Sequence, residues 1–263
     1  MNLLPDDVRC AVAVGISCAP CPGEIALAGG YLSSLCDQAE ELDLRLQLFA
    51  DARAVDMLPQ LRAPVARGHA VDLQAALLHE QKTDMARPLQ ALWEATGDRA
   101  VGVRAADMGR LGLQKMPAAR EHLVRSGLGF VNSDYSTKLP EGPAPGFADK
   151  NAAMLIKHTQ PRLYGEGLLE IPSAGYSAGD FFLTQRRPVE AWCDHLRQCL
   201  DFAHDIGGLL WAPALDLGVL MRHDPDRDTL RTLVTHARSK RSGKVGFYTY
   251  RDIHARASQT ESG

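Results

Sequence analysis

Short apolar runs alternate with amphipathic stretches along most of the chain, and this alternation constrains the fold more than any other feature. Runs typical of buried strands occupy residues 10–16, 44–49, 68–73, 100–104, 129–133, 168–172, 208–212 and 245–248. Between them, helical periodicity predicts helices over residues 24–41, 52–66, 83–95, 117–126, 188–206 and 226–241. Seven or eight consecutive strand–helix units favour a (β/α) barrel of parallel strands. An open doubly wound sheet is the alternative, but no Gly-rich phosphate turn follows the first strand.

The chain of 263 residues is expected to form one domain over residues 1–257, followed by a polar, disordered tail over 258–263. The alternation is interrupted between residues 135 and 166 by a loop rich in proline and glycine, within which residues 154–157 are predicted to form a short strand. Loops of this length are usually functional, so the insertion is expected either to cover a ligand or to contact another subunit of a homo-oligomer.

Composition narrows the choice of partners. With 45% hydrophobic and 23% charged residues, the chain can bury a sizeable core. A net charge of -3 gives no reason to expect a nucleic-acid partner. The first residues show no basic region followed by a long apolar stretch, so no signal peptide is expected, and no apolar run approaches the roughly 18 residues of a membrane span. A cytoplasmic protein is therefore expected.

Six cysteines in a chain without a secretion signal are expected to be reduced thiols. Cys18 and Cys21 have C-x-x-C spacing, which allows a redox pair at the start of a helix as a minor alternative. No second C-x-x-C or H-x3-H pair is present to complete a structural zinc site.

Several segments, taken in order, resemble the motifs of the polysaccharide deacetylases, the carbohydrate esterase family 4 group with a distorted (β/α) barrel. Val12 to Pro20 stands where that family reads V-A-L-T-F-D-D-G-P, and Arg67 to Val71 resembles R-G-H-E-I. The other matching segments are 94–97 with 101–104 (E-x-x-T-G and G-F-R-P-P), 127–133 (G-F-x-Y-D-S), 169–172 (L-x-E-I-P), 200–209, and 236–240. The resemblance covers about residues 10–255 and implies hydrolysis of a C–N amide bond in an N-acylated sugar or a small cyclic amide.

The departures from this pattern fall on the family's metal site. Ser17 and Cys18 align with the paired aspartates, which are the general base and a metal ligand, and Gln74 aligns with the first metal histidine. The second histidine aligns with Leu78 or, with one inserted residue, with His79. Two further positions differ: Ala105-Ala106 replaces two prolines, and Leu215 stands at the histidine of L-H-P. Cys18 and His79 would supply two metal ligands, fewer than the three of a usual catalytic zinc site, so no metal cofactor is expected.

The remaining polar residues at strand ends are candidates for other roles. Ser17 and Cys18 are candidate nucleophiles, with His79 or His69 as the base for the thiol, although a buried thiol that fills the vacated metal site explains Cys18 more simply. Asp72 is the one carboxylate expected to replace the lost base.

Arg104 is expected to bind a substrate anion or to pair with Asp72, Asp107 or Asp134. The candidates for substrate binding are Gln74, His79, Asp107, Ser133, Asp134 and Trp211, of which Ser133 and Asp134 end a strand and Trp211 could stack on a sugar or belong to the core. Two functions therefore remain open: a diverged amide hydrolase, and an inactive pseudoenzyme that binds a carbohydrate or a protein partner.

Overall fold

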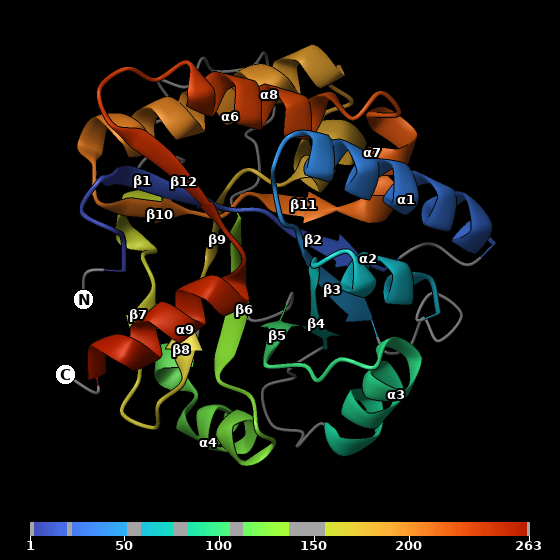
Figure 1. The fold of residues 1–263 in the computed structure, drawn as a ribbon, viewed down its shortest axis with the longest axis vertical. Helices are drawn as coiled ribbons and strands as arrows, with labels where there is room; N and C mark the ends of the chain where they lie inside the picture. Colours follow the sequence, from blue (N-terminus) through green and yellow to red (C-terminus); the bar gives the residue numbers. More distant parts are fainter. Residues whose placement is uncertain are drawn as a thin grey trace.

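A computed structural model describes residues 3–19, 23–51, 59–75, 84–105, 113–136 and 156–261. Its centre is a curled wall of mostly parallel strands with helices on the outside (Figure 1). This arrangement confirms the predicted distorted barrel. The inner face of the wall encloses its own apolar cluster instead of a second helix layer, which distinguishes it from a doubly wound sheet.

The first extended segment of the chain belongs to two sheets. Its first half, β1 (Val8–Ala13), lies between β10 (Leu209–Trp211) and β12 (Lys244–Tyr248). Its second half, β2 (Gly15–Cys18), lies between β11 (Ala214–Asp216) and β3 (Gln47–Asp51). The single strand predicted over residues 10–16 is therefore two strands, because the chain changes partners at Val14.

The rest of the wall continues from β3 through parallel neighbours. In order, these are β4 (Ala70–Gln74), β5 (Gly102–Ala105) and β6 (Phe130–Ser136), after which β8 (Leu169–Glu170) and β9 (Ser173–Gly175) both pair with β6. The short β7 (Arg162–Leu163) is antiparallel to β8. A hydrogen bond from Ala174 N to Ala212 O, 3.0 Å long, joins the two ends of the wall.

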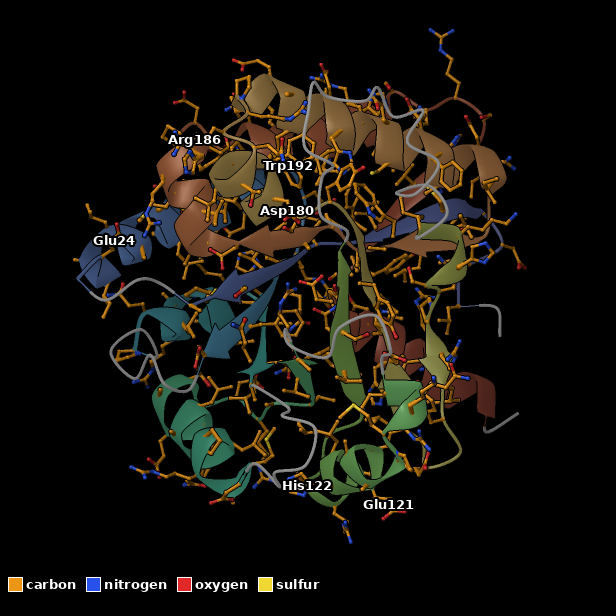
Figure 2. All side chains as sticks on the ribbon, turned by 180° about the vertical axis from the view of Figure 1, so that it is seen from behind. Glu24, Glu121, His122, Asp180, Arg186 and Trp192 are labelled. Atoms are coloured by element: carbon orange, nitrogen blue, oxygen red, sulfur yellow. The ribbon has the colours of Figure 1, made fainter. Side chains whose placement is uncertain are left out.

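Helices cover the outside of this wall. They are α1 (Ile25–Glu41), α2 (Arg62–Ala66), α3 (Ala86–Thr96), α4 (Pro117–Arg125), α6 (Val189–Ile206), α7 (Leu217–His223) and α8 (Asp228–Arg238), with shorter turns at Leu113–Lys115 and Asp180–Thr184. In Figure 2, Glu24 and Glu121 lie at the periphery, whereas Trp192 of α6, with no exposed surface, lies within the helix layer. None of the described helices could serve as a membrane span by length and apolar character.

Helix α9 (Tyr250–Glu261) lies across the end of the barrel where β3 to β6 begin, which is called the floor below (Figure 1). Tyr250 enters the barrel between Phe49 and Phe130, with ring centroids 5.2 and 6.0 Å away. Glycine is required at two positions beside these rings. A Cβ on Gly15 would lie 2.7 Å from the Tyr250 ring, and one on Gly102 would lie 2.3 Å from the Phe130 ring. The sequence thus makes room inside the barrel for an aromatic layer.

Three local predictions differ from the structure. Helix α9 continues to Glu261, so residues 258–261 are helical and not the predicted disordered tail. Ile253 and Ala257 bury one face of that helix in the barrel, and this packing carries the helix past residue 257, the predicted end of the domain. Residues 156 and 157 are helical rather than extended, while 154 and 155 lie outside the described residues. The elements β9, β11 and α7 were not predicted, because strands of three residues and a helix of seven are too short to show a periodicity.

Candidate functional site

The carboxyl ends of the barrel strands carry a set of polar side chains, called the mouth cluster. Side chains alternate between the two faces of a strand. Counted along each strand and across the strand register, these residues stand an even number of positions from the inner aromatic residues, so they lie on the inner side of the barrel. The cluster consists of Ser17, Asp51, Gln74, Arg104, Asn132, Asp134, Ser173 and Asp216. Polar groups at this end of parallel strands form the active sites of most (β/α) barrels.

Ser17 and Gln74 bind each other. The Ser17 hydroxyl donates a hydrogen bond of 2.6 Å to Oε1 of Gln74, across the gap from β2 to β4. Strand β3 lies between them and contributes the buried Asp51, which is in register with Gln74. The structure therefore brings together two residues that the sequence proposed separately, one as a nucleophile and the other as a substrate ligand.

Arg104 is the buried cation of the mouth cluster, with 4% of its surface exposed. Its Nη1 donates to Oδ1 of Asn132 at 2.9 Å, and its Nη2 lies 3.3 Å from Oδ2 of Asp134. Of the partners expected from sequence, Asp134 is thus the one observed. The Nε–H of Arg104 is buried and has no hydrogen-bond partner among the residues that the structure describes. A buried donor without a partner costs about 1–3 kcal/mol, so this group is poised to donate to a ligand oxygen.

Asn132 and Asp216 are members of the mouth cluster that the sequence analysis missed. Asn132 holds Arg104 in place while its Nδ2 donates to Ile171 O at 2.8 Å and to Ser173 Oγ at 3.0 Å. Asn132 precedes the singled-out Ser133 and Asp134, and the period of two along β6 could have indicated that it shares the inner face with Asp134.

Asp216 ends β11 directly opposite Ser17 in the strand register. Its Oδ1 accepts a hydrogen bond of 2.9 Å from Val219 N and so caps helix α7. Burial raises the pKa of this carboxyl, and the Val219 amide, the Arg104 charge and the Ser17 hydroxyl oppose the rise. The alignment placed Leu215 at the family's histidine, but Leu215 belongs to the outer core, and Asp216 is the residue that reaches the mouth.

Cys18 faces away from the mouth, toward α1. Its thiol has no exposed surface, and its closest polar contact is a weak one of 3.7 Å to Ile16 O. Burial raises the pKa of the thiol, and the nearby Asp216 and Cys36 raise it further. A thiol that stays protonated is neither an effective nucleophile nor a metal ligand, so Cys18 is a buried core thiol. Because it faces α1, it does not fill the vacated metal site as the sequence predicts.

Asp72, the expected replacement base, lies below the mouth. Its carboxylate accepts hydrogen bonds from Val101 N at 2.6 Å, Gly102 N at 3.0 Å, Gln47 Nε2 at 2.8 Å and the guanidinium of Arg251 at 2.9 and 3.1 Å. Burial raises the pKa of Asp72, while Arg251 and the two amides oppose the rise. With five donors and no exposed surface, this carboxylate joins strands to α9 and has no lone pair directed at the mouth.

Two other predicted residues also lie outside the mouth cluster. Ser133 is buried on the opposite face of β6 and donates to Oε1 of Glu170 at 2.7 Å. Trp211 is buried in the core, where its Nε1 donates to Ala174 O at 3.0 Å, so it offers no face for a sugar to stack on. His79 and Asp107 lie outside the described residues.

The residues described at the mouth do not fit the metal site that the family resemblance implies. Cys18 points to the helix layer, and Oε1 of Gln74 accepts the Ser17 proton instead of facing a cation. Across the described ranges, no group of three histidine, cysteine, aspartate or glutamate side chains is close enough to hold a metal ion. Amide and hydroxyl groups are poor substitutes for the carboxylate and imidazole ligands of a catalytic transition metal.

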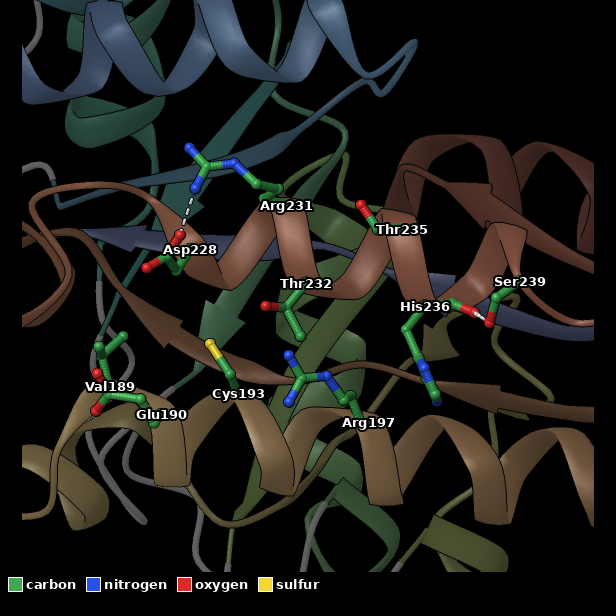
Figure 3. Close-up of a pocket in the computed structure, with 10 residues that line it drawn as sticks. All are labelled: Val189, Glu190, Cys193, Arg197, Asp228, Arg231, Thr232, Thr235, His236 and Ser239. Atoms are coloured by element: carbon green, nitrogen blue, oxygen red, sulfur yellow. Dashed lines mark hydrogen bonds and ion pairs between the residues drawn. The ribbon is translucent and has the colours of Figure 1, made fainter.

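A cavity of about 540 Å³ lies away from the mouth cluster, on the outside of the barrel between α6 and α8 (Figure 3). The cations that line it already have partners, since Arg231 binds Asp228 and Arg197 binds Asp194, each at 2.5 Å. His236 likewise binds Asp201 at 2.7 Å. The groove therefore lacks the unsatisfied buried donor that distinguishes the mouth.

Comparison with known proteins identifies the fold. A Mycobacterium smegmatis protein provisionally named as a polysaccharide deacetylase superposes on the chain with a TM-score of 0.70 at 16% sequence identity, covering 98% of this chain and 93% of that one. The fold is that of the polysaccharide deacetylases. A CE4 esterase from Streptococcus mutans gives a TM-score of 0.50 at 13% identity, covering 92% of this chain and 86% of its own. None of the protein-family models matches the sequence, and neither does any curated protein.

The likeness therefore extends over nearly the whole chain and confirms the family resemblance at the level of the fold. At these identities it carries no residue of the site across. What the mouth of this polysaccharide deacetylase fold does has to be argued from its own side chains.

Proposed function

We propose that the protein hydrolyses a non-peptide C–N amide bond in a small ligand at the mouth cluster, without the metal ion of the family. The ligand is an N-acylated amino sugar or a small cyclic amide. The observation that carries the proposal is the Nε–H of Arg104, a buried donor without a partner, set beside carboxylates at the carboxyl ends of barrel strands.

Amide hydrolysis requires a group that stabilises the negative charge developing on the carbonyl oxygen. In the family a divalent metal performs this task, and here the Arg104 guanidinium is the available positive charge. Asn132 and Asp134 hold that guanidinium through one hydrogen bond on each Nη atom, and the Nε–H is a buried donor that no described residue accepts from, so it can serve the substrate oxygen. The arrangement is fixed before the substrate binds, which is what makes such a donor effective.

The reaction also requires proton transfer and a place for the rest of the ligand. Asp134 and Asp216 are partly exposed carboxylates on the same side of the barrel as Arg104. Ser17 and Gln74 provide a hydroxyl and an amide, which suit the hydroxyl and amide groups of a sugar or a cyclic amide. A ligand that is polar but uncharged matches this mixture of donors and acceptors.

The competing function is binding without turnover. Three predicted catalytic groups favour it because none of them is free to react. Ser17 donates its proton to Gln74, Cys18 is buried, and Asp72 already accepts several hydrogen bonds. The retained mouth polarity is common to both functions, and only a chemical assay separates them.

The test uses wild-type protein treated with EDTA and then freed of the chelator. N-acetylglucosamine, its short oligomers and five-membered cyclic ureides are screened for binding by thermal shift and for turnover by released amine or ring-opened product. Turnover that persists after chelation supports the proposal. Binding without product on prolonged incubation overturns hydrolysis in favour of the competing function, whereas activity that is lost with EDTA and restored by zinc overturns the metal-free reaction.

A further inference from the structure

Asp216 is placed and held as a proton-transfer group would be. Strand β11 sets it opposite Ser17, and its Oδ1 is fixed by Val219 N at 2.9 Å. The fixed Oδ1 orients the carboxylate, and Oδ2 has lone pairs that can accept a proton. Because the side chain is only partly covered, a water molecule can approach it from the mouth.

The other carboxylates of the barrel are less suited to this role. Asp134 is an ion-pair partner of Arg104, so its charge serves to hold the guanidinium. Asp72 is fully buried below the mouth and accepts five hydrogen bonds. Asp51 is buried at the end of β3, two strands away from Asp216 in the sheet order.

The surroundings of Asp216 raise the proton affinity of its carboxylate, as a general base requires. Burial raises the pKa of its carboxyl above the ordinary 3.8, and the charge that acts against this rise is that of Arg104 from β5. Among the described residues, the other titratable group that interacts with it is the Cys18 thiol from β2, which stays protonated. A carboxylate with a raised pKa is a stronger base toward water than an ordinary aspartate, and a pKa nearer the operating pH suits a group that must take up a proton and later release it.

We propose that Asp216 is the general base of the proposed hydrolysis and then the acid that protonates the leaving nitrogen; this inference rests on the proposed function. A water oxygen bonds to the carbonyl carbon while Asp216 takes one water proton, and the carbonyl electron pair moves onto oxygen beside Arg104. The C–N bond then breaks as Asp216 returns the proton to nitrogen. One amide and one water give one carboxylic acid and one amine, with no other reactant.

The test is Asp216→Asn, which keeps a side-chain oxygen for capping α7 and removes the proton acceptor. The expected result is a fall of about 10²–10⁴-fold in kcat with ligand binding retained. The matched control is Asp224→Asn: Asp224 is also a buried carboxyl with a raised pKa, and it accepts hydrogen bonds from the first amides of α8, Asp228 N and Thr229 N, but it lies outside the mouth cluster. The control is expected to keep its kcat.

The outcomes separate the two proposals. If wild type turns over a ligand and Asp216→Asn does so equally well, the role of Asp216 is wrong while the hydrolase function stands. If wild type binds a ligand but never converts it, the hydrolase function and the role of Asp216 both fall.

A second measurement covers the case in which Asp216→Asn does not fold. The wild-type kcat is followed against pH, and it is expected to fall at low pH with one ionisation whose midpoint lies above 3.8. A rate that is independent of pH through that range would rule out a carboxylate base.

Discussion

The mouth and the floor of the barrel each hold one arginine among carboxylates, but the two arginines differ in how completely they are bonded. At the floor, Arg251 contacts Asp72, Asp98 and two backbone carbonyls, and every nitrogen of its guanidinium has a partner. We call Asp72, Asp98 and Arg251 the floor cluster. At the mouth, Arg104 has partners for its two Nη atoms and none for Nε.

The difference separates a structural ion pair from a candidate site in the same barrel. A fully bonded buried pair fixes α9 to β4 and β5 and has no capacity left for a ligand. An incompletely bonded one keeps an unmet hydrogen bond that a ligand can satisfy. Charge alone does not make this distinction, because both arginines are cations among carboxylates.

The largest expected effect lies at the floor. Asp72→Asn leaves the partly buried Arg251 with a weakened partner and should lower the free energy of unfolding by about 3–5 kcal/mol, measured by urea denaturation. The control is Arg45→Gln, which breaks the exposed pair of Arg45 with Asp252 on the same helix α9 and should change stability by about 1 kcal/mol or less. Equal losses in the two variants would contradict a structural role specific to the floor cluster.

Arg104→Lys is the corresponding test at the mouth, and its main effect should be on turnover and not on stability. Lysine keeps the positive charge and loses the Nε–H, so kcat for the amide ligand should fall about 10²–10³-fold. The measurement is kcat on the ligand found in the screen, with circular dichroism as the check on folding. A folded variant with wild-type kcat would mean that the unpartnered Nε–H does not act on the substrate.

The third prediction concerns the pH dependence of stability at the mouth. Because burial raises the folded-state pKa of Asp216, the stability that its protonated form contributes is present below pH 3.8 and lost as the pH rises through the folded value. Asparagine does not ionise, so the stability of Asp216→Asn relative to wild type should increase between pH 4 and pH 7, by on the order of 1 kcal/mol. Denaturation curves at both pH values give this difference, and a difference that shrinks toward pH 7 would contradict the raised pKa.

The smallest expected effect concerns Cys18, which is predicted not to react in the native protein. Its buried, protonated thiol should remain unmodified by iodoacetamide at pH 8 in the native protein and react only after unfolding, as mapped by residue-resolved mass spectrometry. Rapid native alkylation of Cys18 would place a thiolate at the mouth and restore it as a candidate nucleophile.

Much of the frame of this molecule could be read from the sequence. Helix α1 was predicted to within a residue at its start, and α6 was predicted over nearly its full length, because long amphipathic stretches show their period clearly. The order of segments such as 127–133 and 169–172 predicted the family fold, which the structural comparison confirms.

The site could be read only in part. Ser17 and Gln74 were named from the family alignment, and Arg104 and Asp134 from their places at strand ends. In the structure Ser17 contacts Gln74 and Arg104 contacts Asp134. Asp72 and Ser133 also stand on these strands, but Asp72 lies too far down the barrel and Ser133 lies on its outer face. A shift of one residue in a strand reverses the face, and this is also why Leu215 was aligned where Asp216 reaches the mouth.

By itself, the sequence determined the alternation of strands and helices that favours a barrel, and the presence of Ser17 and Gln74 in place of ionisable ligands, because these depend on local period and residue identity. The tertiary structure decided which charged groups are satisfied. Arg251, which no sequence pattern singles out, extends from α9 and donates to Asp72, whereas no described group accepts from the Nε–H of Arg104. Hydrogen-bond partners more than a hundred residues apart in sequence are set by packing, and no local pattern records them.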